Sequence, residues 1–122
     1  MGVINIQGEI QSEIGVMTQL RFLNLGDSSL GGTFPQDFFG LPNVREVHLQ
    51  NAKFEGSLSE DFSNLSATVT EIILKNNNFT GQIPNAFDGF SKLKVLDLSG
   101  NPNLSGGVSV ALCQRRRNME LL

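Results

Sequence analysis

The chain has 122 residues, of which 39% are hydrophobic and 17% are charged, and its formal net charge is −3. This length suits one domain, and the composition is too apolar and too weakly charged for a disordered chain. The acidic balance argues against a nucleic-acid partner, and the longest apolar runs are too short to span a membrane. We therefore expect one folded domain with no membrane contact by this segment itself.

The sequence repeats itself every 24 or 25 residues. The period is marked by a column of glycines at Gly8, Gly32, Gly56, Gly81 and Gly106. In chain order, the repeat gives a partial unit (1–19), four full units (20–43, 44–68, 69–92 and 93–118) and a second partial unit (119–122). A period of this length indicates stacked structural units that bury a shared core.

Each full unit predicts one short strand at an L-x-L pattern. Two columns of apolar residues are expected to point inward: Leu23, Val47, Ile72 and Leu96, and then Leu25, Leu49, Leu74 and Leu98. The residues between these columns point to the opposite face, because side chains alternate along a strand. Each unit also provides the dozen or more residues that a crossover between parallel strands needs. Stacking of the units therefore predicts a parallel sheet.

Two segments show the repeat most fully. Residues 93–101 read L-x-x-L-x-L-x-x-N, and residues 72–84 read L-x-L-x-x-N-x-L-x-G-x-I-P. These residues resemble the leucine-rich repeat family in its plant-type extracellular subclass, and the resemblance covers essentially the whole chain. It implies an α/β-type solenoid, which is a right-handed coil with a short parallel sheet on its concave face. The convex side is expected to be mostly irregular or 3-10 helical.

Asparagines are expected to bind turn backbone inside this coil. Asn77 and Asn101 occupy the ladder position of the last two units, where an unpaired backbone amide would be costly. In the earlier units the position holds Ser28, which can partly substitute, and Ala52, which cannot. The inner ladder is therefore predicted to be incomplete in the first half.

Other columns predict the turns and the packing of the coil. Glycines such as Gly81 permit a tight turn, and Pro35 and Pro84 favour extended backbone. A third column consists of the phenylalanines at positions 38, 62 and 87, which we expect to stack as a buried aromatic spine.

The two ends of the chain match the repeat only in part. Met1 falls on an inward strand position, and Met119 and Leu122 match the L-x-x-L that opens a strand. The family resemblance implies cysteine-paired caps, yet Cys113 is the single cysteine and can form no internal disulfide. These observations suggest a fragment of a longer repeat protein.

Few residues could support catalysis or bind a cofactor. His48 is the only histidine, it lies on the outward side of its strand, and no cysteine or second histidine can reach it. Glu46 and Glu71 should lie side by side about 5 Å apart, which is a spacing used by retaining glycosidases. An open face has no pocket to raise either carboxyl pKa, however, so we expect a solvated binding face, no catalytic residue, no metal and no cofactor. The basic run Arg115–Arg117 is expected to be solvated.

Three N-x-S/T sequons are candidate glycosylation sites, at Asn64, Asn78 and Asn103. The sequon at Asn78 is the strongest of them, since it follows a ladder asparagine and should face solvent. N-F-T-G also resembles glycosylated sites of the family. The sequons favour a secretory history.

The outward columns predict a surface that recognises a protein or a peptide. Its residues are Phe22, Asn24, Glu46, His48, Gln50, Glu71, Ile73, Lys75, Val95 and Asp97. With the family resemblance, this surface favours a non-catalytic recognition module of a receptor-like, cell-surface protein. The alternatives are a secreted inhibitor of a wall-degrading enzyme and an intracellular scaffold. No signal peptide, transmembrane segment or kinase motif is present in these 122 residues, so a fused kinase would lie outside them.

Overall fold

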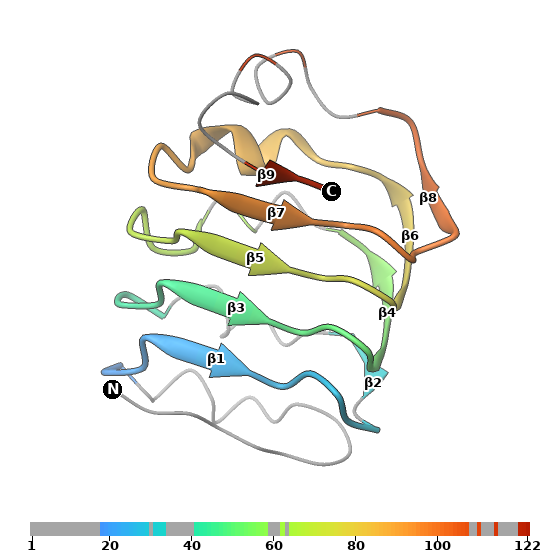
Figure 1. Ribbon diagram of the computed structural model, residues 1–122, viewed down its shortest axis with the longest axis horizontal. Coiled ribbons are helices and arrows are strands. Elements are labelled where there is room, and N and C mark those ends of the chain that lie inside the picture. The colour runs from blue at the N-terminus through green and yellow to red at the C-terminus, as the bar shows by residue number, and fades with distance from the viewer. Residues whose placement is uncertain are drawn as a thin grey trace.

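The computed structural model describes residues 18–29, 31–33, 41–58, 62, 64–107, 110, 114 and 120–122. The chain winds as a coil whose successive turns lie on one another (Figure 1). Two ladders of short parallel strands run along this coil, one of five strands and one of four. The predicted solenoid with a parallel sheet is confirmed.

The five-stranded sheet contains the predicted L-x-L strands. Its members, in order, are β1 (Phe22–Asn24), β3 (Glu46–His48), β5 (Glu71–Ile73), β7 (Val95–Asp97) and β9 (Glu120–Leu121). All four pairings are parallel. The register joins Leu23 to Val47, Val47 to Ile72, and Ile72 to Leu96, which is the first inward column of the sequence analysis.

The four-stranded sheet lies after the inner turn of each coil, where the sequence analysis anticipated only turns and extended backbone. It contains β2 (Gly31–Gly32), β4 (Lys53–Ser57), β6 (Asn78–Gln82) and β8 (Asn103–Ser105). The glycine column runs through it or directly after it, with φ of 78° at Gly32, 94° at Gly56, 81° at Gly81 and 73° at Gly106. These left-handed values explain the glycines, because a side chain there would strain the backbone.

The return path of the third full unit contains a 3-10 helix, η4 (Asn85–Gly89). Pro84 precedes it with φ −75° and ψ 158°, which is the extended conformation that the sequence predicted for this proline. The helix buries Ala86 and Phe87 against the core.

The core is a cluster of buried apolar side chains that continues through the stacked coils. Its members include Leu25, Leu49 and Leu74, which are 0% exposed, and Leu98, which is 8% exposed. Phe62 and Phe87 lie with ring centroids 5.3 Å apart and ring planes tilted by 49°. Coil therefore packs on coil through both aliphatic and aromatic contacts, as predicted for these two phenylalanines.

The register of β9 corrects one prediction. Leu121, and not Leu122, pairs with Leu96, and Glu120 pairs with Val95. Leu122 is 54% exposed, whereas Leu121 packs against the core. The last strand thus keeps the 25-residue spacing, because a shift of one residue would turn the apolar side chain outward.

Several predicted features lie outside the described residues: most of the partial unit 1–19, Pro35, Phe38, Cys113, Arg115–Arg117 and Met119. Among the helices that are described, none is long and apolar enough to cross a membrane.

Candidate functional site: the exposed face of the five-stranded sheet

The candidate site is the exposed sheet face, which we define by the outward side chains of β1, β3, β5 and β7. One column places Phe22, Glu46, Glu71 and Val95 side by side, and the next places Asn24, His48, Ile73 and Asp97 side by side. The structure therefore brings these predicted residues together in the predicted order. Their role in ligand binding stays a prediction.

Two residues of the second column accept hydrogen bonds from the residue two positions further along the chain. The side-chain oxygen Oδ1 of Asn24 accepts a hydrogen bond from Gly26 N at 3.1 Å. Asp97 Oδ1 accepts from Ser99 N at 3.0 Å and from Ser99 Oγ at 2.6 Å. Asp97 is only 7% exposed, so the expectation of an outward-pointing, accessible carboxylate needs correction. Its carboxylate already accepts hydrogen bonds within the turn after β7.

The next outward position of each coil lies just after the strand, at Gly26, Gln50 and Lys75. Gly26 leaves space for the side chain of Gln50. A Cβ on Gly26 would lie 2.6 Å from Gln50 Nε2, so the Gln50 amide occupies space that only glycine leaves free. The Gln50 Oε1 atom is buried and has no hydrogen-bond partner. One coil further on, Lys75 is exposed.

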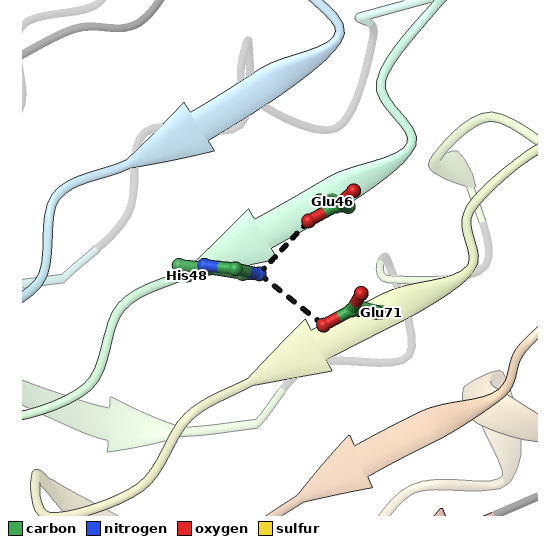
Figure 2. Close-up of side chains that lie close together, drawn as sticks. All are labelled: Glu46, His48 and Glu71. Carbon is green, nitrogen blue, oxygen red and sulfur yellow. Dashed lines mark ion pairs between the residues drawn. The ribbon is translucent and has the colours of Figure 1, made fainter.

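His48 lies between two carboxylates on this face. Its Nε2 atom is 3.3 Å from Glu46 Oε1 and 3.5 Å from Glu71 Oε1 (Figure 2). The three side chains are 27–35% exposed. The sequence predicted no partner for His48, because no cysteine or second histidine can reach it, and the two glutamates were not connected with it. The strand alternation and the repeat register contained the signal, since they place all three residues on one face.

A cationic hollow of about 260 Å³ was not anticipated. It is lined by Arg45, Thr68, Thr70 and Lys92. Arg45 and Thr70 directly precede β3 and β5, and their backbones are linked because Thr70 N donates to Arg45 O at 2.7 Å. The hollow therefore lies at the strand-entry edge of the exposed sheet face and gives that edge a positive charge.

The predicted inner ladder of asparagines that bind turn backbone is confirmed for Asn77 and Asn101. Asn77 Nδ2 lies 2.8 Å from Leu49 O and 3.1 Å from Leu74 O, and Asn77 Oδ1 accepts from Phe54 N at 3.2 Å. Asn101 repeats the pattern one coil later, with Leu74 O at 3.0 Å and Phe79 N at 3.2 Å. Each amide thus joins two coils by hydrogen bonds to buried backbone groups of both.

Ser28 replaces only part of this ladder. Its Oγ donates to Leu25 O at 2.8 Å, which matches the contact that Asn77 makes within its own coil. Ala52 is half-buried against the core and offers no polar group.

The sequon asparagines Asn64, Asn78 and Asn103 are all exposed. Asn78 begins β6 and Asn103 begins β8, so both belong to the four-stranded sheet. That ladder runs along the edge of the coil beside the five-stranded sheet (Figure 1). Glycans on these two residues would therefore leave the exposed sheet face open.

A stacked coil with an inner asparagine ladder and an open parallel sheet defines the chain as a repeat solenoid. The Leucine Rich Repeat family model matches residues 19–41, 68–90 and 92–114, which is more than half of the chain. The chain belongs to the leucine-rich repeat family.

The chain is similar to plant receptor-like proteins. It is 32% identical over 82 residues to Receptor-like protein 31 and 39% identical over 110 residues to Receptor like protein 28, both of Arabidopsis thaliana. These matches cover 67% and 88% of this chain but 10% and 13% of those proteins. A third relative from the same plant, the calmodulin-binding receptor kinase CaMRLK, is 38% identical over 88 residues, which is 70% of this chain and 13% of the kinase. The chain thus spans about a tenth of the length of its curated relatives.

Solved structures of plant receptors are also similar to this chain. The plant peptide hormone receptor RGFR1, solved in complex with RGF2, superposes with a TM-score of 0.82 at 28% identity, over 92% of this chain and 18% of that one. PEPR1, solved with AtPEP1, superposes with a TM-score of 0.85 at 27% identity, over 97% and 16% of the two chains. The coil therefore has the fold of plant receptor repeat domains.

Proposed function

We propose that the chain is a recognition module that binds a protein or peptide through the exposed sheet face and catalyses no reaction. The observation that carries this proposal is the alignment of outward side chains across neighbouring strands. This alignment gives one continuous surface instead of scattered side chains. The similarity to RGFR1 and PEPR1, each solved with a named ligand, supports it.

The chemistry of the face suits an extended ligand. Half-exposed apolar residues, Phe22 and Ile73, flank the polar cluster of Glu46, His48 and Glu71. Interfaces combine apolar anchors with a polar surround in this way. The cationic hollow adds positive charge at the strand-entry edge of the face. The face therefore offers positive charge at this edge and negative charge at Glu46 and Glu71.

We further propose that the module lies on the extracellular side of a receptor-like protein. The named relatives are receptor-like proteins, and the three exposed sequons are compatible with passage through the secretory pathway. Expression of the chain in a plant secretory system, followed by mass spectrometry of glycopeptides, would test this part. Glycans at Asn78 would support it, and empty sequons throughout would contradict it.

Binding can be tested with a displayed library of random 12-residue peptides. The double variant Glu46→Arg plus Glu71→Arg should lose affinity for the enriched peptides, because it reverses the charge at the centre of the exposed sheet face. The control variant Glu55→Arg changes an exposed carboxylate on β4 of the other sheet and should retain binding. Equal affinity of both variants and the unmodified chain would place the site elsewhere.

A further inference from the structure

We propose that Glu46, His48 and Glu71 form a binding site for a divalent transition metal of the zinc class. This inference is independent of the proposed function, because it concerns the metal alone. No metal is expected from the sequence, since no cysteine or second histidine can reach His48. The structure supplies two carboxylates instead.

The strand register gathers the three ligands. Glu46 and His48 are two residues apart on β3 and therefore share one face of the sheet. Glu71 is the direct partner of Glu46 on the neighbouring strand β5. One ligand atom from each residue lies within 4.8 Å of the other two. Short strands in a stacked coil hold such a group more firmly than a loop does.

The spacing suits a metal between the side chains. His48 Nε2 is 3.3 Å and 3.5 Å from the two carboxylate oxygens. A direct N–H···O bond is usually about 2.9–3.0 Å long. Tetrahedral zinc with bonds of about 2.0–2.1 Å separates neighbouring ligand atoms by about 3.3 Å. The two nitrogen–oxygen distances are therefore close to those between neighbouring ligands on one ion, and the three ligand atoms together lie within 4.8 Å of one another.

The Nε2 atom of His48 makes no hydrogen bond with the two carboxylates beside it. It is buried from solvent and makes no hydrogen bond, although it points between the two carboxylates (Figure 2). Within the described residues, no lysine or arginine pairs with Glu46 or Glu71. A divalent cation would bind the ring nitrogen and neutralise both carboxylates at once.

The donor set selects the class of metal. One imidazole nitrogen with carboxylate oxygens suits zinc and its transition-metal neighbours. Calcium prefers six to eight oxygen ligands, which these three residues do not provide. Three protein ligands would leave a fourth position of zinc open for water or another ligand. The alternative arrangement is a protonated His48 that bridges the two glutamates without a metal.

Titration calorimetry of the 122-residue chain with zinc chloride near pH 7 tests the proposal. The protein should be free of a histidine tag, and every sample should carry Cys113→Ser so that the thiol cannot bind zinc. We expect saturable binding of one zinc ion per chain and no comparable binding of calcium or magnesium. The variants His48→Gln and Glu71→Gln should each lower zinc affinity at least tenfold, whereas Glu55→Gln on β4 should keep it.

A second readout uses the single histidine of the chain. Diethyl pyrocarbonate should modify His48 more slowly in the presence of zinc, and Glu71→Gln should remove this protection. Circular dichroism should show that the variants remain folded, since all three side chains are half-exposed. The absence of saturable zinc binding, or an unchanged zinc affinity in folded Glu71→Gln protein, would overturn the proposal in favour of the metal-free bridge.

Discussion

Asn76 donates its side-chain amide to Oδ1 of Asn51 over 2.7 Å, and Asn51 makes the same contact to Asp27 one coil earlier, also over 2.7 Å. All three residues have left-handed backbone, with φ of 52° at Asp27, 57° at Asn51 and 58° at Asn76. Gly100 takes the fourth place in this outer ladder, with φ 72°. Asparagine and aspartate tolerate this conformation better than other residues with side chains, so each position serves both the turn and the contact between coils.

Replacement of Asn76 separates the contribution of the left-handed turn from that of the hydrogen bond between coils. Asn76→Ala loses the hydrogen bond and also places a Cβ without a compensating polar group on left-handed backbone, whereas Asn76→Gly loses only the hydrogen bond. We expect the alanine variant to have a free energy of unfolding about 1 kcal/mol lower than the glycine variant. Urea unfolding followed by circular dichroism measures the difference. Equal stability of the two variants would mean that the left-handed backbone contributes nothing.

Gly100 is required by its neighbour as well as by its backbone. A Cβ at this position would lie 1.9 Å from Asn76 Oδ1, so Gly100→Ala should force the Asn76 side chain to move and cost about 1–3 kcal/mol. Gly106→Ala is the matched control, because Gly106 has a similar left-handed φ of 73° and a Cβ there meets no atom closer than 3.9 Å. Thermal unfolding should give Gly100→Ala a lower melting temperature than the control variant. A shared melting temperature would contradict the steric argument.

Asn77 and Asn78 are adjacent asparagines with opposite environments. Asn77 is 4% exposed and bonds backbone in two coils, whereas Asn78 is exposed on β6. Asn77→Ala should lower the free energy of unfolding by about 1–3 kcal/mol, because it removes the hydrogen bonds to the buried carbonyls Leu49 O and Leu74 O. Asn78→Ala should stay within about 0.5 kcal/mol of the parent chain. Denaturant unfolding of both variants checks this contrast, and comparable losses would refute it.

Phe62 carries the aromatic contact between coils. It is 2% exposed and packs on Phe87, so Phe62→Ala should leave a cavity and cost about 3–5 kcal/mol. Phe22→Ala removes a half-exposed ring from the sheet face and should cost clearly less. Calorimetric unfolding compares the two losses. A larger effect at Phe22 would show that the core is centred elsewhere.

Much of the fold was predictable because every coil repeats the same local chemistry. The alternation of side chains placed Leu23, Val47 and Ile72 in one buried column, and the structure confirms it. Asn77 was predicted to bind turn backbone because an unpaired backbone amide inside the coil would be costly. The four-stranded sheet was not predicted, since its residues show turn glycines and no apolar alternation that would indicate a strand.

The candidate site was predictable in its alignment but not in its side-chain contacts. Glu46 and Glu71 were expected side by side, and they are register partners. That His48 lies between both carboxylates depends on side-chain orientation, which a repeat period does not specify. The same is true of Asp97, whose carboxylate turned towards Ser99 instead of solvent.

The sequence by itself determined the repeat, the inward and outward columns and the membership of the leucine-rich repeat family, because these follow from spacing along the chain. Only the tertiary structure decided which side chains meet across coils. Examples are the outer ladder from Asn76 to Asp27, the cationic hollow beside Arg45 and the contact of His48 with Glu71. The physical reason is that these contacts join residues a full coil apart, and their distances depend on how one coil is seated on the next.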